Sequence, residues 1–198
     1  MITSLKENEI FVFGSNEAGR HGKGAAKQAL KWGARYGIGF GLQGQTFAIP
    51  TKDKNLKVLP LEAIKQYVLS FIDFAEKCYN VPVAATQLQF LVTEIGCGLA
   101  GHTPQQIGPL FSHLIIRNIH NVFIPRSFAF AIRDWYNKNP KEFIEDASYY
   151  WASKIDNMII KDLETAAPPI KWEDEEHYGT VDELRKEFRE RLYGKEAK

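Results

Sequence analysis

Cysteine is scarce in this 198-residue chain, and Cys78 and Cys97 form no CxxC pair. Their spacing favours two free intracellular thiols over a disulfide. No apolar run approaches the ~20 residues that a membrane-spanning helix needs, and no signal peptide follows Met1. The sequence therefore predicts a cytoplasmic protein with no membrane partner.

Neither the net charge nor the histidines of the chain indicate a nucleic-acid-binding protein or a metalloprotein. The formal net charge is +1, so the overall charge indicates no nucleic-acid partner, and the five histidines show no spacing typical of metal ligands. Hydrophobic residues make up 44% of the chain and aromatics 13%, enough to build a folded core. The length suits one domain with an extension, and the pattern changes after residue 126. We therefore expect a core domain over residues 1–126 and a helical C-terminal extension over 127–198.

Short apolar runs alternate with helical patterns along the first two thirds of the chain. Strands are predicted at 10–13, 46–49 (stopped by Pro50), 89–93 and 122–124. Helices are predicted at 24–36, at 61–78, and from Thr103 onward, where a capping threonine precedes a proline. In the extension, helices are predicted at 127–138, 141–165 and 181–193, with a solvated acidic loop at 173–176. This order predicts an α/β fold whose mostly parallel sheet has helices on both faces.

Glycine is concentrated in two places. Nine of the fifteen glycines fall between Gly14 and Gly44, and four more fall between Gly96 and Gly108. Both clusters directly follow predicted strands, and in parallel sheets ligands bind beyond the carboxyl ends of the strands. We therefore expect the two clusters to form two loops of one pocket.

The first loop runs from Gly14 to Gly24 and leads into a predicted helix. Glycine lets backbone N–H groups approach an anion closely, so this loop is a candidate phosphate site. It is not a P-loop, because Arg20-His21 stands where Lys-Ser/Thr is required, and Gly19, Gly22 and Gly24 do not fit G-x-G-x-x-G. The alternative is a tight connection without a ligand.

The second loop, Ile95-Gly96-Cys97-Gly98-Leu99-Ala100-Gly101, also follows a strand and precedes a helix. It strengthens the expectation of an anionic ligand. We expect Cys97 to be a small apolar filler, because a catalytic thiol needs a base and an electropositive setting. His21 and His102 lie in the two loops, where either could line the pocket or transfer protons.

Lys52 follows the strand at 46–49, so its side chain is either an ordinary surface lysine or a part of the pocket. A strand's carboxyl end is the position from which a side chain reaches such a pocket.

Three segments in order resemble the macrodomain family. They are residues 20–33, residues 47–52 (Phe-Ala-Ile-Pro-Thr-Lys) and residues 95–99 (Ile-Gly-Cys-Gly-Leu), and the last two resemble the terminal ADP-ribose glycohydrolase branch. The chain also looks similar to uncharacterised bacterial and phage-associated proteins around Gly14 to Gly24. The resemblance implies a macrodomain-like three-layer α/β/α fold.

The resemblance also implies roles for individual residues. Asn16 would contact the distal ribose together with the loop residues Gly19, Arg20, His21, Gly22, Lys23 and Gly24. The phosphates would lie against Gly96, Cys97, Gly98, Leu99 and Gly101. Lys52 would attack the ribose anomeric carbon as a neutral amine.

Two departures separate this chain from that branch. Ala100 stands where the branch has an aspartate that resolves the lysine adduct, and the earlier strand and acidic residue that read adenine are missing. Asp53, Glu17 or His21 are the available acid–base candidates. The leading hypothesis is binding of ADP-ribose or a related nucleotide, with hydrolysis of an ADP-ribosyl bond as its enzymatic form. The rivals are a non-catalytic binding or sensing module, and an interaction domain whose glycine loops are merely tight turns.

Overall fold

A computed structural model describes residues 2–79, 88–142 and 145–146. The helix predicted at 181–193, the acidic loop at 173–176 and all but a few residues of the helix predicted at 141–165 lie outside these ranges. Within the described ranges, no helix is both long and apolar enough to cross a bilayer.

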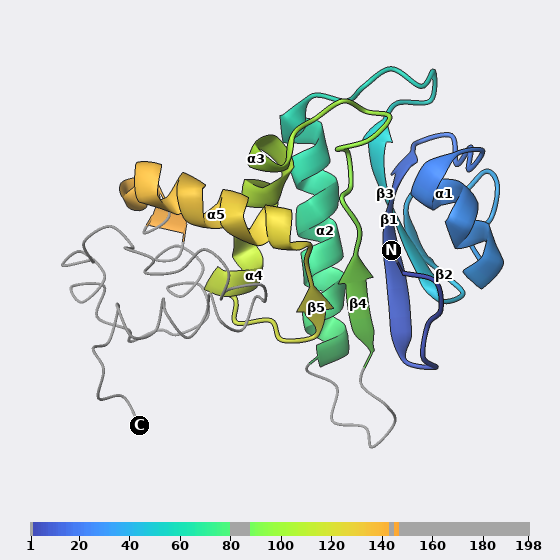
Figure 1. Ribbon diagram of the computed structural model, residues 1–198, viewed down its shortest axis with the longest axis horizontal. Coiled ribbons are helices and arrows are strands. Elements are labelled where there is room, and N and C mark those ends of the chain that lie inside the picture. Colours follow the sequence, from blue (N-terminus) through green and yellow to red (C-terminus); the bar gives the residue numbers. More distant parts are fainter. Residues whose placement is uncertain (1, 80–87, 143–144, 147–198) are drawn as a thin grey trace.

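A five-stranded sheet in the order β2-β3-β1-β4-β5 forms the centre of the molecule (Figure 1). The strands are β1 (Glu9–Asn16), β2 (Gly41–Gln43), β3 (Thr46–Lys52), β4 (Gln89–Val92) and β5 (Val122–Phe123). Every pairing is parallel except that of β2 with β3. The predicted α/β class and mostly parallel sheet are therefore confirmed.

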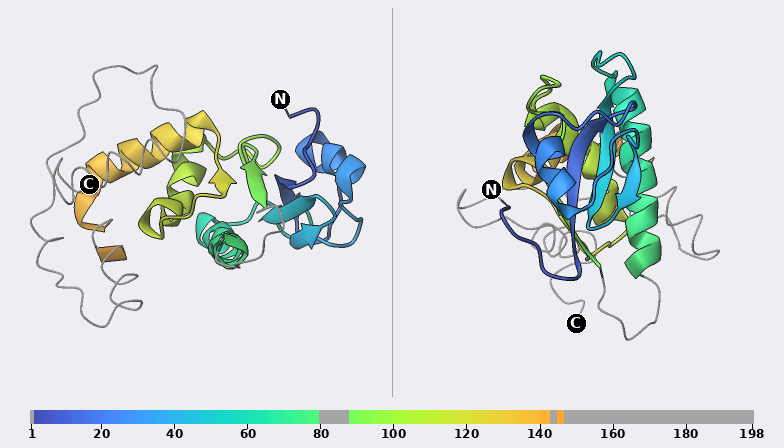
Figure 2. Two further views of the ribbon diagram at one scale, coloured as in Figure 1. Left: turned by 90° about the horizontal axis from the view of Figure 1, so that it is seen from below. Right: turned by 90° about the vertical axis from the view of Figure 1, so that its right-hand side faces the viewer.

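Helices lie on both faces of this sheet (Figure 2). One face carries α1 (Gly24–Ala29), which continues as the 3-10 turn η1 (Leu30–Trp32). On the other face lie α2 (Leu61–Tyr79), α3 (Pro104–Ile107), the 3-10 turn η2 (Gly108–Phe111), α4 (His113–Ile116) and α5 (Arg126–Lys138). The arrangement follows from the βα alternation of the sequence.

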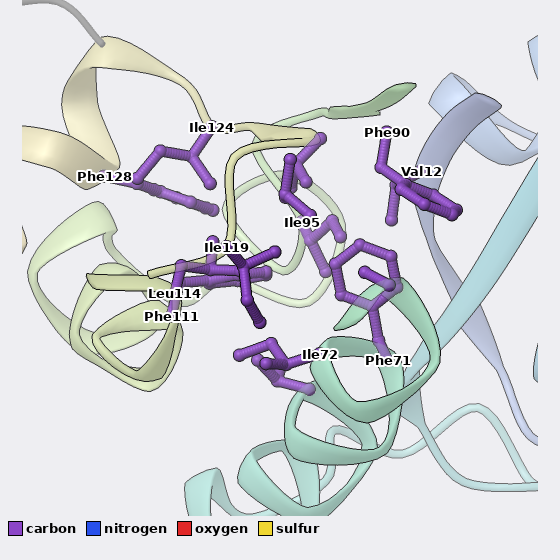
Figure 3. Packing of buried hydrophobic residues seen from close by; sticks show 14 of the residues in the cluster. Val12, Phe71, Ile72, Phe90, Ile95, Phe111, Leu114, Ile119, Ile124 and Phe128 are labelled. Atoms are coloured by element: carbon purple, nitrogen blue, oxygen red, sulfur yellow. The ribbon is translucent and has the colours of Figure 1, made fainter. Parts of the chain in front are cut away.

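Successive residues of β1 point to opposite faces of the sheet, as the pleat of a strand requires. Ile10 and Val12 belong to the larger hydrophobic cluster, under α2, whereas Phe11 and Phe13 pack with the alanines of α1. The larger cluster continues through Phe71 and the helices beyond it (Figure 3). Burial of each such aromatic contributes roughly 1.5–3 kcal/mol, so both faces of β1 hold the sheet in place.

Several predicted boundaries were wrong, among them the end of the strand predicted at 10–13, which continues as β1 to Asn16. The helix predicted to reach residue 36 ends at Trp32, because Gly33 adopts φ 104° and its N–H bonds back to Leu30. The strand predicted to stop at Pro50 continues to Lys52. Proline is tolerated there because β2 pairs only with residues 46–48, which leaves that side of Pro50 without a ladder partner among the described strands.

The helical segment after Thr103 is divided into α3, η2 and α4. Gly108 and Pro109 interrupt it, since proline lacks the N–H that a continuous helix needs. Gly108 also packs closely against α5: a Cβ at this position would lie 2.7 Å from the Cβ of Ala131. Strand β2 escaped prediction because its three residues contain no apolar run.

The helix predicted at 127–138 is present as α5 and belongs to the main core. Phe128, Ile132 and Tyr136 are buried in the larger cluster together with residues of the sheet. The packed core therefore extends past residue 126, at which the division between core and extension was predicted; that division stays a prediction.

Candidate functional site

A pocket of about 540 Å³ lies at the carboxyl ends of β1, β3 and β4. This is the position expected for a ligand site in a parallel sheet, and the volume is typical of small-molecule sites. Of the residues predicted for the site, those that line it are Asn16, Arg20, Gly22, Lys23, Gly24, Lys52, Gly96, Gly98 and Leu99. The lining does not include Gly19, His21, Asp53, Cys97 or Gly101.

Asn16 fixes the course of the first loop. Its Nδ2 donates to the carbonyl oxygen of Arg20 at 2.9 Å, and the Arg20 N–H donates to Asn16 Oδ1 at 3.0 Å. Because Asn16 is 7% exposed, this pair closes the turn within the protein and sets Arg20 at the rim of the pocket. The amide retains one N–H and one lone pair for a ligand.

Gly19 shapes the loop from behind the pocket. It has φ 64°, and a Cβ there would lie 2.3 Å from the backbone nitrogen of Ile38. Gly39 packs in the same way, since its Cβ would lie 2.2 Å from the carbonyl oxygen of Asn16. Segment 37–39 thus supports the loop at a distance that only glycine permits.

His21 is fully buried beneath the loop. Its Nε2 lies 2.9 Å from Ser15 Oγ, and its ring meets Phe13 edge-on with centroids 5.2 Å apart. Burial lowers the pKa of His21, so the ring is neutral at pH 7. The Ser15 hydroxyl donates to the carbonyl oxygen of Asn16 at 3.3 Å. Its oxygen is then available to accept a hydrogen bond from His21 Nε2–H. In this position His21 anchors the loop to β1 and lies behind the pocket wall.

The second loop turns back on itself beside the first. Gly101 N–H donates to the Gly98 carbonyl at 3.0 Å, and His102 N–H donates to the Gly96 carbonyl at 3.0 Å. Gly96 has φ 78°. A Cβ on Gly14, in β1, would lie only 3.4 Å from Gly96 N, so the two loops are neighbours although they are far apart in the sequence.

Cys97 is not part of the pocket lining and packs, half-buried, against the larger hydrophobic cluster. Burial and the nearby Glu94 carboxylate raise the pKa of its thiol to about 11. The thiol is therefore protonated at pH 7 and a poor nucleophile. This agrees with the expectation of an apolar filler.

Lys52 and Asp53 are adjacent in sequence but differ in role. Lys52 lines the pocket at the end of β3. Asp53 Oδ1 instead accepts from the N–H groups of Asn55 and Lys57, each at 2.8 Å. Asp53 therefore orders the turn over residues 53–57.

Backbone N–H groups without partners line both sides of the pocket. Within the described ranges, those of Gly22 and Lys23 in the first loop and Gly98, Leu99 and Ala100 in the second make no hydrogen bond to the protein. Such runs of free N–H groups carry partial positive charge and are typical of anion sites.

The charged side chains in the lining are unequal in sign. Arg20, Lys23 and Lys52 contribute positive charge, and Glu94 is the one carboxylate among the described residues that line the pocket. Glu94 Oε1 accepts from Ser127 Oγ, at the start of α5, at 2.7 Å. The site thus combines a cationic rim with one oriented carboxylate.

Sequence patterns missed several lining residues. Ser15, Thr51 and Thr93 stand at the carboxyl ends of three neighbouring strands, and Glu94 and Leu56 follow two of those strands. Their positions one or a few residues beyond predicted strands were the available signal. Among the described residues, no group of three metal-ligating side chains comes together.

No protein-family model, curated protein or solved structure matches this chain. The function is therefore argued from the geometry of the pocket and from the motifs of the sequence.

Proposed function

We propose that the pocket binds a nucleotide of the ADP-ribose type, with its phosphates against the two glycine-rich loops. The observation that carries this proposal is the presence of free backbone N–H groups on both sides of one pocket, in loops 22–23 and 98–100. Arg20, Lys23 and Lys52 add positive charge at its rim. Charge-assisted bonds from such donors suit a diphosphate.

The macrodomain-like resemblance supports the same ligand. It implies that Asn16, the two loops and Lys52 converge on one nucleotide, and Asn16, Lys52 and part of each loop line one pocket. It also implies a mostly parallel sheet with helices on both faces, which this chain has. The macrodomain-like assignment is itself part of the proposal.

Binding can be tested by thermal shift with ADP-ribose, NAD, AMP and ADP side by side. A ligand at 100 times its Kd stabilises the native state by about 2.7 kcal/mol. For a chain of this length that corresponds to a rise in Tm of roughly 5–11 °C. We expect the largest rise with ADP-ribose.

Gly22→Glu provides the matched structural test. A Cβ at Gly22 meets nothing within 4 Å, so the variant should fold while its carboxylate repels the phosphates. Gln105→Glu, an exposed change outside the pocket lining, adds the same charge and should leave the shift intact. Equal ligand-induced shifts in the two variants would contradict the proposal.

Hydrolysis of an ADP-ribosyl bond is the second candidate, and the presence of Lys52 and Glu94 in one pocket favours it. In this reaction the Lys52 amine would form a bond to the anomeric carbon and give up a proton to the attached group, which leaves as its own bond to that carbon breaks. Water would then attack the anomeric carbon and give a proton to Glu94, which would pass it to Lys52 Nζ as the carbon–nitrogen bond breaks and the ribose is released. We assign the acid–base role to Glu94 and not to His21 or Asp53, the candidates from the sequence, because neither of those two residues lines the pocket.

Turnover separates the two candidates. Lys52→Ala should abolish release of ADP-ribose from a modified substrate while retaining most of the binding. A wild-type protein that binds ADP-ribose and releases none would leave the non-catalytic module as the function, in keeping with Ala100 in the position of the family aspartate.

A further inference from the structure

Leu56 has an unfavourable backbone conformation and an unfavourable exposure at the same time. Its φ is 66°, in the left-handed region that a branched side chain rarely adopts, and the residue is 42% exposed. It nevertheless lies in the lining of the pocket. Strain of this kind is retained where the surrounding structure enforces it, and functional sites are where it concentrates.

The turn that carries Leu56 is heavily constrained. Asp53 Oδ1 accepts from two backbone N–H groups, Leu56 N–H donates to the Asp53 carbonyl at 3.1 Å, and Asp53 N–H donates to the Lys57 carbonyl at 2.8 Å. A bridge between Lys52 and Val58 closes the turn at its base. These bonds hold Leu56 beside the pocket in a conformation that leucine alone would avoid.

Leu99 presents a second apolar side chain to the same pocket. It is 68% exposed and comes from the loop after β4, whereas Leu56 comes from the loop after β3. Strand β1 lies between β3 and β4 in the sheet, so the two loops rise on either side of the end of β1, as the right-hand view of Figure 2 shows. The two leucines therefore approach the pocket from two sides.

We propose that Leu56 and Leu99 form an apolar clamp that holds the flat faces of the ligand's nucleobase. This rests on the proposed function: in a nucleotide the phosphates and sugar are polar, and the faces of the base are its main apolar surface. The pocket of about 540 Å³ has room for more than an anion. Covering the two leucines removes apolar surface from water.

Calorimetry with ADP-ribose and with inorganic pyrophosphate tests the clamp, because pyrophosphate contacts the loops without a base. Leu56→Ala and Leu99→Ala should each weaken ADP-ribose binding about fivefold, as expected for part of a leucine's burial. Pyrophosphate binding should be unchanged in Leu56→Ala, because Leu56 contributes no group to the proposed phosphate site. The matched control is Leu42→Ala, which is equally exposed at 43% but lies on β2, outside the pocket lining.

A substitution that relieves the strain separates a binding role from a structural one. Leu56→Gly suits φ 66° and should raise the Tm of the free protein while weakening ADP-ribose binding at least as much as Leu56→Ala. Unchanged ADP-ribose affinity in the leucine variants, or an equal loss for pyrophosphate in Leu56→Ala, would overturn the clamp. If the wild-type protein binds neither ADP-ribose nor pyrophosphate, the proposed function is overturned, and the clamp with it.

Discussion

The buried His21 makes the stability of this protein depend on pH in a definite direction. Burial lowers the pKa of His21 below its ordinary 6.5, and the groups around the ring (Ser15, Phe13 and Tyr36) carry no charge to offset a proton. The unfolded chain therefore takes up a proton more readily than the folded one. The contribution of His21 to the free energy of unfolding is therefore fully present above pH 6.5. It is lost as the pH falls from 6.5 towards the lowered pKa of His21 in the folded protein.

The size of this effect has a thermodynamic limit. One proton taken up on unfolding changes the free energy of unfolding by at most about 1.4 kcal/mol per pH unit. Burial also lowers the pKa of His113, so both histidines contribute to the slope of the free energy of unfolding against pH in the wild-type protein. The contribution of His21 is the difference between the wild-type protein and His21→Phe, a variant that fills the same ring-shaped space beside Phe13.

Urea denaturation between pH 5 and 8, followed by tryptophan fluorescence, measures that difference. At pH 8 the variant should lose about 1 kcal/mol, the value of one hydrogen bond to Ser15. Below pH 6.5 its free energy of unfolding should fall less steeply than that of the wild-type protein. Parallel slopes over the whole range would refute the assignment of a buried, neutral His21.

Three further predictions follow from the site. Asp53→Ala should lower the free energy of unfolding by about 1 kcal/mol, read from the urea midpoint, because it removes two hydrogen bonds from an exposed turn. Asp53→Asn should restore most of this loss. A loss of activity without any change in stability would contradict the structural role of Asp53. Cys97 should react slowly with iodoacetamide at pH 8, compared with free cysteine by mass spectrometry, because its pKa is about 11; labelling as fast as free cysteine would refute its burial. Glu94→Gln should abolish any turnover while retaining ADP-ribose binding by calorimetry, whereas full turnover would remove Glu94 from the reaction.

Much of the fold could be predicted from apolar patterns alone. The apolar run at 10–13 corresponds to β1 and the apolar stripe at 61–78 corresponds to α2. Both were predictable because the apolar residues of each local pattern are the ones that are buried in the folded core. Strand β2 could not be found in this way, since a strand of three residues, the first a glycine, carries no periodicity. The extension of β3 past Pro50 depends on β2 pairing only with residues 46–48, which is a property of the assembled sheet.

The candidate site was predictable to a similar extent. Glycine clusters after strands located both loops, and these loops do line one pocket. The role of Asp53 was missed, although its carboxylate binds the backbone N–H groups two and four residues further along the chain, as in an Asx turn. The burial of His21 depends on contacts with β1 and with Tyr36, fifteen residues away in sequence, which no local pattern reveals.

The most direct test of the nucleotide site is an amide NMR titration of the ¹⁵N-labelled protein with ADP-ribose. The free N–H groups of Gly22, Lys23, Gly98, Leu99 and Ala100 should show the largest shifts, because they would gain phosphate acceptors. Amides of β2, at the sheet edge, should stay unchanged. Saturable shifts in both loops would support the account, and an unchanged spectrum, or shifts confined to residues outside the pocket, would contradict it.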